Sequence, residues 1–221
     1  MSELKEDIRI LGKDYLKDIE DYNIRRAWPV PEKTALLVID MQVYFKPLIE
    51  PILPNVISLI DMCRSFGIKI FFTRHGHINP SKDGGMLREW WGDLIQYGTP
   101  DWELIKDLDI LQEDVIIEKN RYSAFFGTDL DNQLQDRGVI NLIICGVMTN
   151  CCCETTARDA FVHDYRVFFA ADATAAANDD LHIASLKNLA YGFAHIVTSH
   201  DLYKLGDWAQ GPGSRERKKQ P

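Results

Sequence analysis

The chain alternates between apolar runs of strand length and stretches in which apolar residues recur at helical spacing. Residues 34–40, TALLVID, form a continuous run of leucine and branched residues, which is typical of a strand buried on both faces of a parallel sheet. Residues 54–67 follow, with a proline near the start and Gly67 at the end, and this pattern predicts a helix. The first unit of the chain is therefore a strand followed by a helix.

The same alternation continues to residue 199. The further predicted strands are 68–74, 115–119, 141–147, 166–172 and 195–199, and the further predicted helices are 129–138, roughly 151–164 and 180–193. Repeated strand–helix–strand units imply right-handed crossovers, so we predict a three-layer α/β/α fold with a doubly wound sheet of six parallel strands. We expect one domain over residues 1–205, its first 25 or so residues forming an accessory helix, and a flexible tail over 206–221.

Residues 75–114 interrupt this alternation. Within them, the stretch GGMLREWWGDLI at 84–95 predicts a short helix that is rich in large apolar side chains. We interpret this segment as a lid or as one wall of a pocket.

Composition narrows the choice of partners and compartment. The 221 residues carry a formal net charge of -8, so a nucleic acid or an anionic membrane is a poor partner and a small-molecule substrate fits better. The N-terminal residues lack the apolar run of a signal peptide, and no stretch reaches the roughly 18 apolar residues of a membrane span, which predicts a cytoplasmic protein. In that reducing compartment, five cysteines with three of them adjacent at 151–153 indicate free thiols.

Three kinds of reactive side chain are predicted to meet at one edge of the sheet. Ligands of doubly wound folds bind beyond the carboxyl ends of the strands. Asp40 ends the first predicted strand, Lys119 ends another, and the cysteines at 151–153 follow a third. A helix start and a nearby ammonium both favour a thiolate, and a carboxylate can accept its proton. Successive helical residues point about 100° apart, so we expect only one of the three thiols to aim into the cleft.

Three motifs occur in order along the chain: LLVIDMQVYF at 36–45, EKNRYSAFFGTDL at 118–130 and ICGVMTNCCCETTARDAF at 144–161. Together they resemble the isochorismatase-like hydrolase superfamily, also called the cysteine hydrolases, over about residues 30–200. The resemblance implies a catalytic triad of Asp40, Lys119 and Cys152, in which the thiol is the nucleophile. The other two cysteines of the triplet are expected to pack in the core.

The resemblance also implies details of the turn that carries the nucleophile. The peptide bond between Val147 and Met148 is expected to be cis, and the backbone amides of Met148 and Cys152 are expected to form the oxyanion hole. Such a pair of amides stabilises the negative charge that develops on a carbonyl oxygen during nucleophilic attack.

The predicted substrate pocket is small and partly aromatic. The resemblance places Phe45 and Tyr122 next to the triad and places the tryptophan pair at 90–91 where members of the superfamily close the site. We therefore predict Phe45, His75, Trp91 and Tyr122 as substrate-binding residues. A pocket of this kind admits carbamoyl amino acids, ureides, simple amides and cyclic amides, so the motifs define the reaction more closely than the substrate.

Two departures from known subfamilies narrow the chemistry. Nicotinamidases carry an Asp-x-His run and further metal ligands after the second strand, whereas this chain reads TRHGHINPSKDGG at 73–85; no metal or other cofactor is expected, and nicotinamide is disfavoured. Many isochorismatases have glycine at the position of Cys152 and a carboxylate-binding arginine at the position of Gly84. The cysteine and the glycine found here favour attack on a C–N bond.

The leading hypothesis is a cysteine amidohydrolase that cleaves a small amide, carbamoyl or ureido substrate through a thioester. One alternative is a vinyl ether hydrolase of the isochorismatase type, for which Asp40 and Lys119 suffice. Another is a non-catalytic interaction protein that uses this fold. The resemblance further implies a homo-oligomer, either a dimer or a tetramer.

Overall fold

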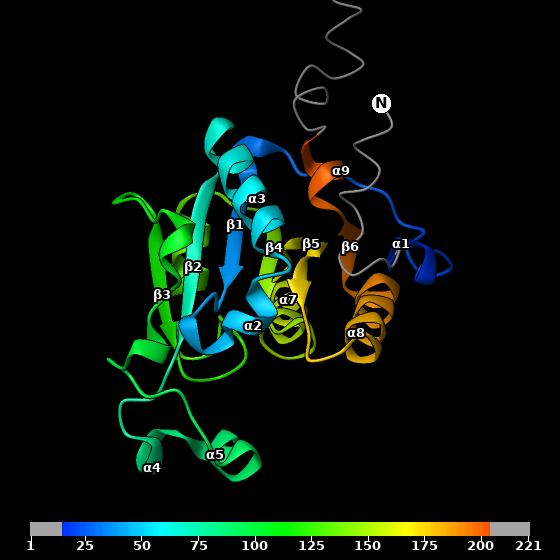
Figure 1. The fold of residues 1–221 in the computed structure, drawn as a ribbon. Helices are drawn as coiled ribbons and strands as arrows, with labels where there is room; N and C mark the ends of the chain where they lie inside the picture. Colours follow the sequence, from blue (N-terminus) through cyan, green and yellow to red (C-terminus); the bar gives the residue numbers. More distant parts are fainter. Residues whose placement is uncertain (1–14, 204–221) are drawn as a thin grey trace, which may run out of the picture.

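The computed structural model describes residues 15–203, which contain one six-stranded sheet in the order β3-β2-β1-β4-β5-β6 (Figure 1). All neighbouring strands pair in parallel. The strands are β1 (Thr34–Ile39), β2 (Lys69–His75), β3 (Val115–Lys119), β4 (Asn141–Val147), β5 (Arg166–Ala175) and β6 (Ala194–Val197). The predicted doubly wound α/β class is therefore confirmed. The winding direction reverses between β1 and β4, and this is the point at which such folds bind ligands.

The helices connect the strands and cover both faces of the sheet. They are α1 (Tyr15–Asp18), α2 (Lys46–Ile49), α3 (Leu53–Ser65), α4 (Pro80–Asp83), α5 (Gly85–Trp91), α6 (Leu130–Asp136), α7 (Glu154–Val162), α8 (Asp179–Gly192) and α9 (Ser199–Tyr203). A π-helical turn, Thr149–Cys153, joins β4 to α7. Within residues 15–203, four short 3-10 turns lie at 31–33, 43–45, 100–102 and 106–108.

The sheet separates two hydrophobic cores, and β1 contributes to both. Ala35, Leu37 and Ile39 belong to the core formed with α6, α7 and α8. Leu36 and Val38 belong to the core formed with α2, α3 and α9. Successive side chains of a strand point to opposite faces, so a strand covered on both sides has to be apolar at every position. The continuous run at 34–40 was a reliable strand signal for this reason.

The short helix predicted within 84–95 is present as α5, which ends before Gly92, and a separate helical turn, α4, precedes the predicted segment. Gly85 has φ 52° and Gly92 has φ 75°, a left-handed conformation that interrupts a helix and that glycine adopts at little cost. Figure 1 shows α4 and α5 beyond the carboxyl ends of the strands. We call residues 78–95 the arm.

The N-terminal segment packs beside α8 and β6. The Tyr15 hydroxyl donates to Oδ1 of Asp179 at 3.0 Å, and Asn23 Nδ2 donates to the Ile196 carbonyl at 2.9 Å. Within the described residues only one helical turn, α1, represents the predicted accessory helix; residues 1–14 and the predicted tail at 206–221 lie outside them. No single helix in residues 15–203 is long and apolar enough to cross a membrane, although the bent pair 43–49 and 53–65 passes that test by length and composition.

Candidate active site

The site begins where β1 and β4 end side by side. Asp40 follows β1 with φ 48°, a left-handed conformation that aspartate tolerates better than most residues. Opposite it, Gly146 has φ 112°, and a Cβ atom at this position would fall on the backbone of Ile39. Only glycine therefore allows β4 to pass β1 this closely. The next peptide bond, between Val147 and Met148, is cis, as the resemblance implied.

Asp40 and Lys119 form a fully buried ion pair. Lys119 Nζ donates to Oδ2 of Asp40 at 2.7 Å, and the Thr73 hydroxyl donates to Oδ1 at 2.6 Å. Lys119 also donates to the carbonyl oxygen of Arg121 at 3.1 Å. Burial alone would lower the pKa of Lys119, but the Asp40 carboxylate and the neighbouring Cys152 raise it further than burial lowers it. The lysine therefore stays charged inside the protein.

Cys152 lies in the π-helical turn before α7, and its thiol is hydrogen-bonded to both Asp40 and Lys119. Burial raises the pKa of Cys152, the ammonium of Lys119 lowers it, and the carboxylate of Asp40 raises it again, so that the net direction is upward. The ammonium favours the thiolate as expected, but burial has the larger effect on the pKa and favours the thiol. The resting nucleophile is a thiol.

The three adjacent cysteines have different surroundings. Cys153 is fully buried in the core, whereas Cys151 and Cys152 both line the cavity. The Cys151 thiol is hydrogen-bonded to the hydroxyl of Tyr122. The expectation that a single thiol faces the cleft is therefore wrong. A π-helical turn has more residues per turn than an α-helix, so neighbouring side chains diverge less than the 100° that we assumed.

A cavity of about 190 Å³ opens beside Cys152. It is lined by Tyr44, Phe45, His75, Leu87, Trp91, Asp93, Leu94, Ile95, Tyr122, Met148, Cys151 and Cys152. All four residues predicted to bind substrate are among them. Those that the sequence did not suggest include Tyr44, which is next to Phe45 in the first motif, and three consecutive residues at 93–95 that follow the tryptophan pair. Their position beside predicted residues is the signal that could have identified them.

His75 forms part of the cavity wall at the end of β2. Gln42 holds its backbone, because the His75 amide donates to Gln42 Oε1 and Gln42 Nε2 donates to the His75 carbonyl, both at 2.8 Å. Burial lowers the pKa of His75 to about 4, with a further lowering from the charge of Lys119. The imidazole is therefore neutral near pH 7. Gln42 belongs to the first motif but was not recognised there as a support for the pocket.

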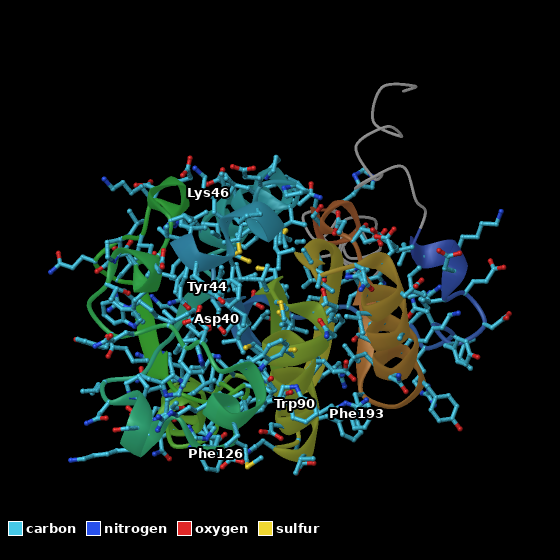
Figure 2. The ribbon with its side chains drawn as sticks, turned by 60° about the horizontal axis from the view of Figure 1, so that its bottom comes forward. Asp40, Tyr44, Lys46, Trp90, Phe126 and Phe193 are labelled. Atoms are coloured by element: carbon cyan, nitrogen blue, oxygen red, sulfur yellow. The ribbon has the colours of Figure 1, made fainter. Side chains whose placement is uncertain are left out.

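The two tryptophans of the arm have different roles. Trp91 lines the cavity, is 52% exposed and donates from Nε1 to the Tyr122 hydroxyl at 2.7 Å. Trp90 is 77% exposed and does not line the cavity. Figure 2 looks toward this side of the molecule and shows Asp40 inside the fold and Trp90 on the arm. Only one of the two residues that were predicted to close the site is placed to do so.

The histidines near the site do not form a metal centre. Within residues 15–203, no group of three or more His, Cys, Asp or Glu side chains is arranged to hold an ion. The His75 and His77 rings lie 5.2 Å apart, and His77 Nδ1 is 3.3 Å from Oδ1 of Asp83, which holds the beginning of the arm. These side chains therefore do not match the set of metal ligands that the sequence analysis described for nicotinamidases.

Comparisons with known proteins agree with this geometry. A family model described as the isochorismatase domain matches residues 34–201. Nicotinamidase 3 of Arabidopsis thaliana is 50% identical over 184 residues, which cover 82% of this chain and 92% of that protein. Enterobactin synthase component B of Escherichia coli K12 is 32% identical over 179 residues, 78% of this chain, but the chain spans only 63% of that protein.

A solved structure extends the likeness to three dimensions. The cysteine hydrolase from Pseudomonas syringae pv. phaseolicola 1448A superimposes with a TM-score of 0.79 at 30% identity, covering 83% of this chain and 97% of that one. Residues 34–201, which the family model matches, include all six strands and the buried Asp40–Lys119 pair. The chain belongs to the isochorismatase family and is a hydrolase of that family.

Proposed function

We propose that the chain is a cysteine amidohydrolase in which Cys152 attacks the carbonyl carbon of a small amide, carbamoyl or ureido substrate. The observation that carries this proposal is the hydrogen bonding of the Cys152 thiol to the buried Asp40–Lys119 pair. A nucleophile, a base and a cation that orients the base are the parts that covalent amide hydrolysis requires.

The first half of the reaction uses the resting thiol. Asp40 takes the proton of Cys152 as the sulfur bonds to the carbonyl carbon, and Lys119 stabilises the negative charge that moves between carboxylate and thiolate. In our proposal the backbone amides of Met148 and Cys152 receive the oxyanion. Asp40 then returns the proton to the nitrogen, the C–N bond breaks, and ammonia or an amine leaves a thioester.

The second half regenerates the enzyme. Asp40 accepts a proton from water, the resulting hydroxide attacks the thioester carbonyl, and the C–S bond breaks. The proton goes back to the sulfur of Cys152, and the carboxylic acid or carbamate product leaves. One water is consumed for each C–N bond, and no oxidant or reductant is needed.

An aromatic primary carboxamide is the first substrate to test. The relative named Nicotinamidase 3 weighs against our sequence-based expectation that nicotinamide is disfavoured, since that expectation rested only on the missing metal-ligand spacing. In our proposal Phe45, Trp91 and Tyr122 surround a planar ring and His75 contacts it as a neutral hydrogen-bonding group. Such a pocket holds a ring without using a metal ion.

The alternative ether hydrolase is less well supported. The resemblance to isochorismatases implies a carboxylate-binding arginine at the position of Gly84. A Cβ atom at Gly84 would collide with the carbonyl oxygen of Pro80 and crowd Leu94, so the observed arm does not accommodate a side chain there. The presence of Cys152 adds a nucleophile that ether hydrolysis does not need.

The proposal also covers the domain organisation, the compartment and the oligomeric state of the protein. All the site residues come from one sheet and its connections, which supports a single domain over residues 1–205. All five cysteines are free, which supports a reducing, cytoplasmic location. A homo-oligomer, dimer or tetramer, is part of the same proposal, and sedimentation equilibrium would test it.

The deciding experiment is ammonia release from a panel of nicotinamide, benzamide and small ureides, run beside isochorismate turnover. We expect Cys152→Ala to lose about a thousandfold or more of the ammonia release. Cys151→Ala is the matched control, since it removes the neighbouring thiol of the same cavity, and it should retain most of the activity. Equal consumption of isochorismate by wild type and Cys152→Ala would contradict the proposal, and absence of any turnover by wild type would favour a non-catalytic protein.

A further inference from the structure

The described residues of the cavity wall carry negative charge only. Among the described residues that line the cavity, Asp93 is the only one with a charged side chain. The remaining polar groups are the thiols, the tyrosine hydroxyls, the indole of Trp91 and the imidazole of His75, and burial keeps that imidazole neutral by lowering its pKa to about 4. The wall therefore contributes one negative charge and no positive charge.

Two cations close to the cavity, Lys119 and Arg121, are already engaged, and Arg88 of α5 is exposed and does not line the cavity. Lys119 pairs with Asp40 at 2.7 Å beneath Cys152, and the two charges offset each other. The Arg121 guanidinium donates to the carbonyl oxygens of Asp83 and Asn120 at 2.8 and 2.7 Å, and it is not among the residues that line the cavity. A carboxylate on a bound substrate would lose water without gaining a cationic partner, which is costly.

Asp93 is placed to act on the substrate by its charge. It is exposed and comes directly after Gly92, the residue at which α5 ends. Within residues 15–203 no hydrogen bond or ion pair neutralises its carboxylate. Its neighbours Trp91 and Leu94 also line the cavity, so the exposed Asp93 carries its negative charge where the cavity wall meets solvent, which we call the rim.

We infer that the cavity selects uncharged or cationic amides, that it rejects amides which carry a carboxylate, and that Asp93 at the rim is a specificity-determining residue. This inference rests on the proposed function, since it names the class of amide that the same site takes. It separates planar carboxamides from carbamoyl amino acids, ureido acids and isochorismate, all of which carry at least one carboxylate.

The test uses three ligands that share a six-membered ring with one carboxamide and differ in charge: benzamide, the 1-methyl-3-carbamoylpyridinium cation and 3-carbamoylbenzoate. Their dissociation constants would be measured by calorimetry on Cys152→Ala, which does not consume them, and on the same protein with Asp93→Asn or Asp93→Lys. The matched controls are Glu89→Gln and Glu89→Lys, because Glu89 is an exposed carboxylate of the same arm that does not line the cavity.

We expect the cation and benzamide to bind and the anion to bind most weakly. Asp93→Asn should shift the ratio of anion to cation dissociation constants by about two- to fivefold toward the anion, the size typical of an exposed charge, and Asp93→Lys should shift it further. The Glu89 variants should leave the ratio unchanged. Anion binding as tight as cation binding in the Cys152→Ala protein, or an equal shift with Glu89→Lys, would overturn the inference.

Failure of the proposed function gives a different result. Ammonia release from the same three compounds by the wild-type protein would be measured in parallel. If neither these compounds nor the panel of amides and ureides is hydrolysed while the anion still binds most weakly, the amidohydrolase proposal is wrong and the charge selection stands. If 3-carbamoylbenzoate is hydrolysed with the highest kcat/KM, the amidohydrolase proposal stands and the charge selection is wrong.

Discussion

The floor of the cavity and the arm above it differ in almost every physical respect. The floor, formed by Asp40, Lys119, Cys152 and Thr73, lies at the ends of strands, is buried and has a hydrogen-bond partner at each reactive atom. The arm at 78–95 consists of two short helices separated and ended by glycines with positive φ. In our proposal the reaction chemistry depends on these buried groups, and exposed residues of the arm contribute to the choice of substrate.

The comparison also shows where a mutation is costly. Removing one member of a buried pair leaves an uncompensated charge, and no water is available to replace the partner. An exposed side chain of the arm, such as that of Trp90, can be replaced by another because solvent fills the space. The following predictions test this difference, beginning with the largest effect.

The strongest test of the floor is Lys119→Met. We expect ammonia release to fall by about a thousandfold, and the free energy of unfolding to fall by about 3–5 kcal/mol because Asp40 loses its buried cation. Urea denaturation and a turnover assay measure the two effects. Lys82→Met, which removes an exposed lysine of the arm, is the control and should change the free energy of unfolding by less than about 0.5 kcal/mol.

A double variant sharpens this result. Asp40→Asn combined with Lys119→Met removes both charges, so it should recover part of the lost stability without recovering turnover. If the double variant is as unstable as the sum of the two single variants, the ion pair is not the reason for the loss. The floor would then be stabilised mainly by packing, and the contrast with the arm would be weaker.

A fall in pH is expected to have an intermediate effect on the free energy of unfolding. Burial lowers the pKa of His75 and of His182 from 6.5 to about 4 in the folded protein. The unfolded chain then binds protons that the folded one does not, so this stability is complete above about pH 6.5 and is lost as the pH falls toward 4. Each histidine should lower the free energy of unfolding by roughly 2–3 kcal/mol at pH 4.5 relative to pH 7.

Urea denaturation at the two pH values measures this loss, and His182→Gln isolates one contribution. His182 Nδ1 lies 2.9 Å from the Thr149 hydroxyl of the nucleophile turn, and a glutamine can retain a hydrogen bond there without titrating. The variant should be less sensitive to acid than wild type. An unchanged difference between pH 7 and pH 4.5 would mean that His182 is not the group that titrates.

The smallest effect is expected on the arm. Trp91→Phe removes the donor to the Tyr122 hydroxyl while keeping an aromatic ring, so we expect KM to rise by about fivefold, equivalent to about 1 kcal/mol for one hydrogen bond, with little change in kcat. Trp90→Phe is the matched control and should leave both constants unchanged, since Trp90 does not line the cavity. Equal effects of the two substitutions would mean that the tryptophans act through the arm as a whole.

The fold was predictable where the hydrophobic pattern leaves one solution. The run at 34–40 is apolar at each position from 35 to 39, and this pattern fits a strand covered on both faces. The arm was predicted less well. The spacing of its apolar residues is helical. The positive φ of Gly85 and Gly92 depends on the path by which the chain returns to the cavity, and the spacing of apolar residues does not predict that path.

The candidate site also has one part that the sequence predicts and another that depends on packing. Asp40 and Lys119 end predicted strands of a parallel sheet, so their approach follows from topology alone. The protonation state of Cys152 does not follow from topology. Burial raises the pKa of this thiol more than Lys119 lowers it, and burial is a property of the packed molecule. The same holds for Cys151, which reaches the cavity because the turn is π-helical.

The order of residues along the chain was enough to predict the parallel α/β architecture, the edge of the sheet at which the reactive residues gather, and the residue types available for amide chemistry. These follow from local periodicity and from strand ends, which are recorded in neighbouring residues. The packed molecule was needed to show which thiols face the cavity, which tryptophan reaches Tyr122, and that Asp93 is the one charged side chain among the described residues of the wall. Those features depend on contacts between segments far apart in the chain and on the exclusion of water from the space between them.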